Sequence, residues 1–569
     1  MRTLVALFLG LIATSELVHA QTVGSCDHGV ATDTLDVGDV RAALYNTGGF
    51  FWRGSGHVYT VPKAGTAQAI FAANLWAGGL AEDGSYRITG TDFGLGEYWP
   101  GPLDENGNPP EDCADYDRMY SVYDADIRAY EADGRLTDDL RDWPYHLGAP
   151  VVDGDGIEGN YDLAAGDRPE IYGEQSIWWV MNDMGNADPL SPGSQIGLEA
   201  QVHAFASSCY PSSDPSLRLF DQPISRTTYY HITMIHKGPA ALRDFYMGWW
   251  TYADLGNPAD NFAGSDTTRR MGYFYNGDDF DEGRDGYGNR PPALGVILAD
   301  GIDVSFDGRD NDDDGLVDEF YERLPFTSFQ YYTSGPFVNG NPSFRTIEPY
   351  YYMSSRWRDG RSVTYGGQGL DGTEQVRFMF PGDPVTKSYW SEESVSPQGF
   401  SNTPANRRFV MSSGPFDFAP GDTTDFTLAI VWAQGEDRLS SIRALRGTAD
   451  IAKSAVGDLK TYNPHACLAL AEPEEPHPAA LGYYILRQNY PEPFSQQTAI
   501  RYEIIDTVPV QLHVYDLLGR RVRTLVDGVQ AAGVYDVVFE AGGLPTGTYF
   551  YRLEAAGYVS ITRRMVLQR

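Results

Sequence analysis

The sequence predicts a mainly β protein, in which a large multi-sheet body with few helices precedes a C-terminal immunoglobulin-like β-sandwich. First, β-branched and aromatic runs recur, as in residues 227–238 and 407–435, and Gly, Pro and Asp interrupt them. Second, 13% of the residues are aromatic, which is too many for a disordered acidic chain. Third, 569 residues exceed one ordinary domain, so several cores are expected.

The first twenty residues have the pattern of a secretory signal peptide. Arg2 provides a basic start, Leu4–Ala13 is apolar, and residues 18–20 fit the small-residue rule for cleavage. The apolar run is too short to cross a bilayer, and no later run of about 18 apolar residues follows it. We therefore expect an exported mature chain that begins at Gln21 and has no transmembrane segment.

The body, residues 21–469, is expected to contain two helices among its strands. Residues 437–462 place apolar side chains near helical spacing, and Asp437 can cap the start of that helix. Residues 116–134 form the second candidate, which ends at Gly134.

A Pro/Glu/Ala stretch, residues 470–480, has the composition of a linker and precedes a C-terminal domain, residues 481–569. Apolar and polar side chains alternate in Val510–Val514 and in Tyr549–Glu554, and residues 559–568 form another strand-like run. Glycines lie between these runs, where turns need positive φ. About seven short strands in ninety residues predict an immunoglobulin-like sandwich.

Charge also separates the two parts. The chain carries a net charge of −36, yet residues 481–569 hold nine basic and eight acidic residues, so residues 21–480 carry −37. Nucleic-acid backbones and anionic membrane surfaces are poor partners for so acidic a protein. Only five lysines occur, and nearly all positive charge is arginine.

The four cysteines, Cys26, Cys113, Cys209 and Cys467, all lie in the mature chain. An even number in an oxidising compartment allows two disulfides in three pairings, and the alternative is four buried thiols. Their wide, irregular spacing does not resemble a zinc site.

The C-terminal domain resembles a known family. Residues 488–494, QNYPEPF, match the N-Y-P-N-P-F pattern of the type A C-terminal sorting domain of type IX secretion and depart from it only at Glu492. VYDLLGRRVRTLVDG, AAGVYDVVFEAGGLPTGTYFYRLEA and the terminal RRMVLQR extend the likeness over residues 483–569. The resemblance implies export across the outer membrane of Bacteroidota-type bacteria, with the secretion machinery as partner. The positions that match the family's sorting motif are Asn489, Tyr490, Pro491, Pro493, Phe494, Tyr515, Asp516, Gly519, Arg520, Gly547 and Tyr549.

The body is similar to an extracellular region common in large secreted proteins that bear this tail. Residues 144–186 and 407–422 carry part of this likeness, which extends over most of residues 35–465. Those proteins have no activity that the resemblance could transfer.

An acidic stretch, DNDDDGLVDE, has the spacing of a calcium loop. Aspartates fall at loop positions 1, 3, 5 and 9, a glycine takes position 6, and a leucine carbonyl is available at position 7. Tyr321 stands where an EF-hand has its bidentate Glu, so the pattern is closer to short Asp-rich loops of thrombospondin type 3 style. A solvated acidic loop is the alternative. The predicted ligands are Asp310, Asp312, Asp314, Leu316, Asp318 and Glu319.

Two weaker loops follow the same logic, and turns of this composition also occur without an ion. One offers Asp153, Asp155, Asn160 and Asp162 as calcium ligands. The other offers Asn276, Asp278, Asp279 and Asp281. Calcium is the cofactor that the sequence predicts.

The sequence contains no motif of a nucleophile or zinc enzyme: H-E-x-x-H, G-x-S-x-G and S-x-x-K are all absent. A glycosidase needs only two carboxylates, which leave no short signature. The pairs Trp178-Trp179 and Trp249-Trp250 could stack on sugar rings, although core packing is favoured. Whether the body is an enzyme therefore stays open, and no catalytic residue is assigned.

These observations favour a secreted or cell-surface protein, exported by Sec and then by type IX secretion. Its body is expected to be non-catalytic, with a structural, adhesive or ligand-binding role, and to be stabilised by calcium. The alternative is a secreted carbohydrate-binding protein or polysaccharide hydrolase delivered by the same sorting domain. A glycan or a surface protein is the ligand class left open, and no nucleic acid is expected.

Overall fold

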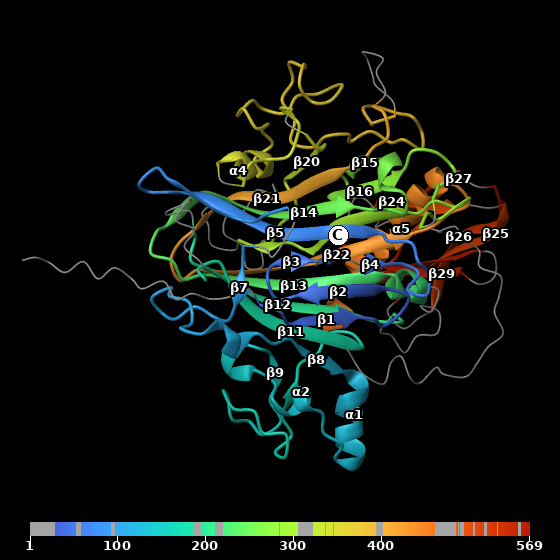
Figure 1. Cartoon of the computed structure of the whole chain (residues 1–569). Helices are drawn as coiled ribbons and strands as arrows, with labels where there is room; N and C mark the ends of the chain where they lie inside the picture. The colour runs from blue at the N-terminus through green and yellow to red at the C-terminus, as the bar shows by residue number, and fades with distance from the viewer. Residues whose placement is uncertain are drawn as a thin grey trace, which may run out of the picture.

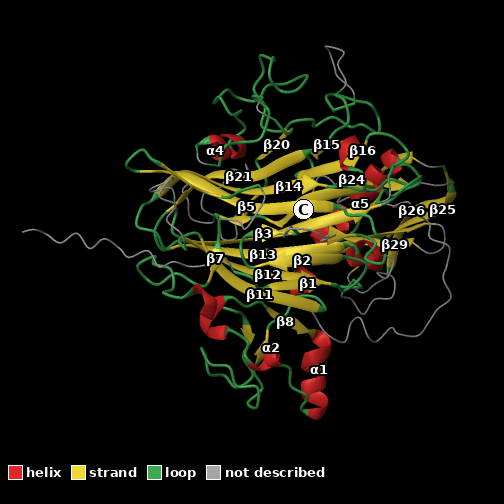
Figure 2. Cartoon of the chain, viewed as in Figure 1, coloured by secondary structure: helices red, strands yellow, loops and turns green. Residues whose placement is uncertain are grey.

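The fold is known from a computed structural model that describes residues 29–568 with gaps. The gaps are residues 53–58, 93–96, 186–194, 211–219, 284, 305–322, 336, 345, 394–401, 461–484, 487–488, 490–493, 505–506, 517–519, 532 and 556–558. In these described parts strands predominate and helices are few, which confirms the predicted mainly β class (Figure 2).

Two large antiparallel sheets form the body within the described residues (Figure 1). The nine-stranded sheet runs β15 (Asn261–Asp266), β16 (Met271–Asn276), β17 (Ala293–Asp300), β22 (Thr423–Ala433), β13 (Thr227–His236), β12 (Leu198–Ala206), β11 (Gln175–Asn182) and β7 (Trp99–Pro100), and β8 (Tyr120–Tyr123) also pairs with β11. The six-stranded sheet runs β20 (Ser328–Tyr332), β21 (Arg408–Phe418), β14 (Leu242–Ala253), β5 (Ile70–Ala81) and β3 (Gly49–Phe50), with β6 (Tyr86–Thr89) on β5.

The main core lies between these two sheets and is rich in aromatic rings. Phe50 contacts Trp179 and Trp249, with ring centroids 6.0 and 4.8 Å apart, and Tyr230 lies 5.8 Å from Trp249. The rings therefore join the facing sheets, because Trp179 and Tyr230 belong to the larger sheet and Phe50 and Trp249 to the smaller one.

The outer face of the larger sheet is covered by two further layers. Helix α5 (Arg438–Lys460) packs its apolar side on β17 and β22. The segment from η1 (Cys113–Tyr116) to β10 (Arg168–Pro169) packs on β11, and in Figure 1 it lies below that strand while β5 and β14 lie above. This segment also includes α1 (Asp124–Asp133), α2 (Asp138–Arg141), η2 (Tyr145–Leu147) and β9 (Val151–Val152).

Smaller elements complete the described part of the body. They are a sheet of β1 (Thr32–Leu35), β2 (Arg41–Tyr45) and β4 (Tyr59–Thr60), the pair β18 (Ile302–Asp303) and β19 (Arg323–Leu324), and the short helices α3 (Asp221–Ser225), η4 (Pro258–Asp260) and α4 (Glu348–Met353).

The C-terminal domain is a sandwich of two antiparallel sheets around its own core, as predicted. Its described strands form one sheet of β23 (Ile485–Leu486), β24 (Gln497–Ile504) and β27 (Gly533–Glu540). The other sheet has the order β26 (Arg521–Gln530), β25 (Val508–Asp516), β28 (Gly547–Ala555) and β29 (Val559–Leu567).

One of the two predicted helices begins where the sequence predicted, and the other begins later. Helix α5 begins after Asp437, whose carboxylate accepts the N–H of Ser440 at 2.7 Å, so the predicted cap is present. The helix expected over residues 116–134 begins only at Asp124, because Tyr120–Tyr123 pair with β11 as strand β8. Gly134 ends α1 in the left-handed conformation, as expected.

Both cysteines that the structure describes, Cys113 and Cys209, are disulfide-bonded, which excludes four free thiols. The other two, Cys26 and Cys467, lie outside the described residues. No helix in the described part of the chain combines the length and apolar character needed to span a bilayer.

Candidate metal centre

Three aspartates come together at the base of one loop in the segment that covers β11. Strands β9 and β10 pair Val152 with Arg168, so the intervening loop leaves and returns at one place. This pairing places Asp167 beside Asp153 and Asp155, and carboxylate oxygens of the three lie within 4.8 Å of one another. A group of this kind offers the hard oxygen ligands that calcium prefers.

Backbone N–H groups fix each carboxylate of this cluster. Asp153 accepts from the N–H groups of Asp155 and Gly156 at 3.0 and 2.6 Å. Asp155 accepts from the N–H of Ile157 at 2.8 Å. Asp167 accepts from two N–H groups on opposite arms of the loop, those of residues 154 and 162, at 2.9 and 2.6 Å.

A glycine is needed where the two arms meet. A Cβ added to Gly154 would lie 2.2 Å from the carbonyl carbon of Gly166, so a side chain there would push the arms apart. Since Asp153 and Asp167 flank this contact on the two arms, the close approach is what lets their carboxylates meet.

The electrostatics of the cluster favour a cation. The N–H groups of Asp162 and Gly154 lower the pKa of Asp167, so this buried carboxyl is ionised at neutral pH. Asp153 is exposed and Asp155 is half-buried, which leaves the cluster open to solvent on one side. Among the described residues, no arginine, lysine or histidine forms an ion pair with any of the three.

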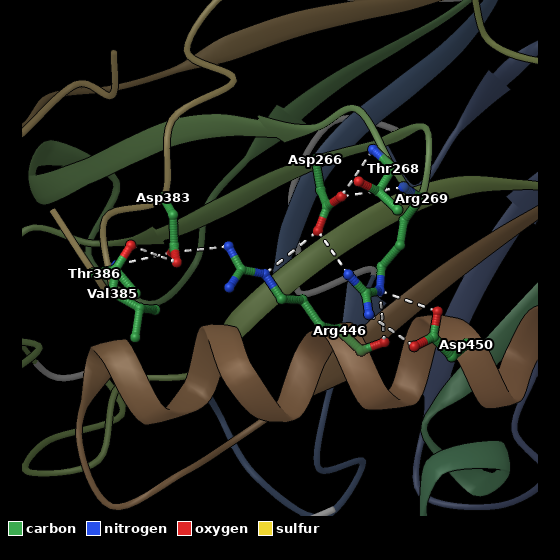
Figure 3. A network of polar contacts seen from close by, with 8 residues as sticks. All are labelled: Asp266, Thr268, Arg269, Asp383, Val385, Thr386, Arg446 and Asp450. Carbon is green, nitrogen blue, oxygen red and sulfur yellow. Dashed lines mark hydrogen bonds and ion pairs between the residues drawn. The ribbon is translucent and has the colours of Figure 1, made fainter. Parts of the chain in front are cut away.

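Another group of carboxylates, at the contact between α5 and the β15–β16 turn, is neutralised by arginines, as Figure 3 shows. Arg269 pairs with Asp266 at 3.0 Å and with Asp450 at 2.8 Å. Arg446 reaches Asp266 at 3.4 Å and Asp383 at 2.9 Å. The aspartates here fasten α5 to the sheet, and they differ from the Asp153 cluster in having guanidinium partners.

The structure brings together only part of the predicted second loop. Asp153 and Asp155 meet, whereas Asn160 donates its amide N–H to Asp155 at 3.0 Å, and the Asp162 carboxylate accepts the N–H groups of Ala164 and Ala165. Sequence spacing missed Asp167, because its place depends on the β9–β10 pairing rather than on the loop pattern. Val151 and Val152 before the loop, which are typical strand residues, were the available signal.

The four predicted ligands of the third loop have separate partners. Asp281 is buried and accepts the N–H groups of Asn257 and Tyr287 at 2.9 and 2.7 Å. Asn276 and Asp278 accept N–H groups within their own turn, at 2.9 and 2.8 Å. Asp279 lies 3.6 Å from the guanidinium of Arg438.

A carboxyl outside that prediction lies beside this loop. Burial and the neighbouring Asp281 raise the pKa of Asp260 to about 7. Burial likewise raises the pKa of Asp281. Near neutral pH the Asp260 carboxyl is therefore partly protonated, because its negative charge beside Asp281 is disfavoured.

The first and strongest predicted loop, with Asp310, Asp312, Asp314, Leu316, Asp318 and Glu319, lies outside the described residues. Its flanks are described: β18 and β19 pair Asp303 with Arg323. The guanidinium of Arg323 also reaches Asp425 at 3.2 Å and Asp300 at 3.8 Å, which fastens this strand pair to the larger sheet.

Three of the seven described residues of the sorting motif hold the sandwich together. Asn489 is buried and donates to the hydroxyl of Thr498 at 2.9 Å. Phe494 is buried, and its N–H and carbonyl bond to residues 566 and 568 beside β29. The buried Tyr549 donates its hydroxyl to the carbonyl of Pro545 at 2.8 Å.

The remaining motif residues are at turns or on the surface. Asp516 and Arg520 form an ion pair at 2.7 Å across the β25–β26 connection. Gly547 begins β28, and Tyr515 lies half-buried on the outer face of β25. Tyr490, Pro491, Pro493 and Gly519 lie outside the described residues.

Two solved structures show slight likeness to the chain. A polysaccharide lyase is 7% identical with a TM-score of 0.18, over 74% of this chain and 38% of that one. The dimeric latent form of PorU from Porphyromonas gingivalis is 10% identical with a TM-score of 0.15, over 76% and 35%. The chain thus matches little more than a third of each of these two proteins. TM-scores this low do not establish a shared fold. No curated protein matches the chain significantly.

The C-terminal domain gives a definite match. Residues 488–568 match the family described as the secretion system C-terminal sorting domain, over the range where the sandwich and its motif residues lie. The chain therefore carries a C-terminal sorting domain of the type IX secretion kind.

Proposed function

We propose that this protein is displayed or released outside the cell, where its body acts as a non-catalytic structural, adhesive or ligand-binding module that calcium stabilises. Residues 1–20 direct the first step, through Sec, and the sorting domain directs the second. The observation that carries the calcium assignment is the cluster of Asp153, Asp155 and Asp167, which has an ionised buried member and, among the described residues, no ion pair with a cationic side chain.

Repulsion among the three carboxylates supports an ion at this cluster. Like charges a few ångströms apart repel unless a cation lies between them, and backbone N–H groups here hold the carboxylates in place rather than letting them separate. A calcium ion present at about 100 times its dissociation constant would stabilise the folded body by about 2.7 kcal/mol. The sequence pattern around Asp310–Asp314 supports a further ion.

The burial of the tryptophan pairs supports a non-catalytic body over a glycan-processing one. Trp178 is 2% exposed, and Trp179, Trp249 and Trp250 are fully buried. These rings fill the cores instead of forming a platform for sugar rings, which the carbohydrate alternative needs.

Calcium binding is tested on the full chain by melting with tryptophan fluorescence. All eleven tryptophans lie before residue 481, so the signal reports the body alone. Excess chelator should lower the melting temperature of the body, and elemental analysis of the untreated protein should find calcium. A melting temperature unchanged by chelator, with no bound metal, would refute the assignment.

The cluster itself is tested by substitution. Asp167→Asn should reduce the calcium content by one ion per chain and reduce the stabilisation that calcium gives. Glu158→Gln is the matched control, because Glu158 is an exposed carboxylate in the same loop and outside the cluster. Equal calcium content in both variants and the unaltered protein would place the ion elsewhere.

Export is tested by deleting residues 481–569 in a host with type IX secretion. The truncated protein should accumulate in the periplasm, because the remaining signal leads only that far. If the truncated protein appeared outside the cell at the level of the full chain, the tail would not be the export signal.

A further inference from the structure

The sorting domain presents one sheet face that its own core does not cover. The four-stranded sheet buries the inward side chains of β25 and β28, such as Leu512 and Leu553, in the sandwich. The alternate residues of the same strands point outward. The register of the sheet therefore fixes which residues share the outer face.

The first row across this face is Arg521, Tyr515, Phe550 and Arg564. Tyr515 pairs with Arg521 on β26 and with Phe550 on β28, and Phe550 pairs with Arg564 on β29. Directly opposed residues of an antiparallel sheet point to the same side. Both arginines are exposed and both rings are half-buried, so an aromatic centre lies between two cationic ends.

The second row adds a third arginine. His513 pairs with Thr524 and with Arg552, and Arg552 pairs with Thr562. The guanidinium carbon of Arg552 lies 5.2 Å from the centre of the Tyr515 ring, and its Nε donates to the Thr562 hydroxyl at 3.1 Å. This arginine is held in place by its neighbours while 44% of its side chain stays exposed.

The third row has the opposite character. Gln511 pairs with Asp527 and with Glu554, and Glu554 lies 3.9 Å from Arg552. The acidic groups thus gather toward one end of the face, and the arginines gather with the aromatic rings at the other. In a chain of net charge −36, three arginines on one end of one sheet face are a local reversal of sign.

We propose that this outer face, centred on Arg521, Tyr515, Phe550, Arg552 and Arg564, docks an acidic surface of a protein in the export machinery. The inference rests on the proposed role of the tail as export address. Charge complementarity selects an acidic partner. The buried places of Asn489, Phe494 and Tyr549 show that these motif residues stabilise the fold, which leaves recognition to exposed residues such as those of this face.

The composition of the face favours a protein partner over an anionic glycan or lipid. Arginine and tyrosine dominate the hot spots of protein–protein interfaces, where a ring and a guanidinium together lose water on contact. An anionic lipid surface is recognised by clusters of about four to eight basic side chains, more than the three arginines of this face. The four-stranded frame also fixes the spacing of the arginines, which suits a folded partner.

The experiment reverses the charge of the face in the full chain and measures export in a type IX secretion host. The test variant combines Arg521→Glu, Arg552→Glu and Arg564→Glu. The matched control combines Arg135→Glu, Arg141→Glu and Arg361→Glu, which changes the net charge equally at exposed sites of the body. A third variant replaces the three tail arginines by lysine, and near-UV circular dichroism of each purified protein checks the fold.

The charge-reversed tail should lower the exported fraction by about tenfold or more, while the body control and the lysine variant keep most of it. Export of the folded Glu variant at the unaltered level would overturn the proposal. Normal export with loss of retention at the cell surface would also overturn it, in favour of an anionic glycan or lipid. The chain lacking residues 481–569 serves as reference: if it too is exported, the role of the whole tail fails, and not only that of this face.

Discussion

Removing the negative charge of Glu392 should destabilise the body more than any change to a surface ion pair. Glu392 and Arg407 form a buried pair in which the side chains are 0% and 4% exposed. The Arg407 Nε donates to both carboxylate oxygens, at 3.0 and 3.1 Å. Ala263 N–H and the amide of Asn402 complete the shell of the carboxylate at 2.7 and 2.9 Å.

The size of the effect follows from this geometry. Glu392→Gln keeps the shape of the side chain but leaves the Arg407 guanidinium charged, buried and without its counterion. It also turns an amide NH₂ toward groups that are themselves donors. Loss of one partner of a buried ion pair costs about 3–5 kcal/mol, whereas an exposed pair contributes about 1 kcal/mol or less. The exposed pair Arg361–Asp359 provides the comparison.

The double variant Glu392→Gln/Arg407→Gln should recover part of the loss, because no lone charge remains. The free energy of coupling in the double-mutant cycle should then be about 2 kcal/mol or more. Urea unfolding followed by tryptophan fluorescence measures each variant in the body alone, since residues 481–569 contain no tryptophan. Asp359→Asn is measured in parallel. A cost of Glu392→Gln no larger than that of Asp359→Asn would show that the buried carboxylate is neutral or solvated, and the reasoning would fail.

Three further results are expected. Burial lowers the pKa of His203 to about 3 from about 6.5 in the unfolded chain, so its contribution to stability is complete above pH 6.5 and is lost as the pH falls. At pH 5 this loss is about 2 kcal/mol, and urea unfolding at pH 5 and 7 should show a smaller difference in His203→Phe than in the unaltered protein. Arg446→Met leaves Asp383 without its guanidinium, so amides of α5 should exchange hydrogen faster while those of β13 do not, and equal rates would contradict the role of this contact. Asn489→Ala removes a buried hydrogen bond and should destabilise the sandwich by about 1–3 kcal/mol, seen as a lower calorimetric transition of the tail with the tryptophan transition unchanged.

The sequence predicted those elements whose pattern lies within one short segment. Alternating side chains identified β25 and β28, and Asp437 with the apolar spacing after it identified the start of α5. The helix expected over residues 116–134 shows the limit of that reasoning. Its first half pairs with β11, and hydrogen bonding to a neighbouring strand outweighs local spacing in Tyr120–Tyr123.

The candidate metal centre shows the same limit at the level of a site. Asp153 and Asp155 belong to one short pattern, and that pattern was visible. Asp167 is the buried member whose lowered pKa keeps the cluster charged, yet only the β9–β10 register brings it there. Sequence spacing also grouped Asn276 with Asp281, although the backbone N–H groups that these side chains accept lie in different parts of the loop.

In the sorting domain, most residues of the proposed binding face differ from the buried residues of the family motif. Three of the motif residues, Asn489, Phe494 and Tyr549, are buried and stabilise the fold of the sandwich. The exposed arginines of the sheet face, Arg521 and Arg564, belong neither to the motif nor to the core, so their charge can follow a partner. Arg521, Tyr515, Phe550 and Arg564 are spread over 50 positions in sequence, and only the register of four strands aligns them. A partner that reads this row therefore recognises the folded sandwich, and an unfolded tail that keeps every motif residue should not be bound.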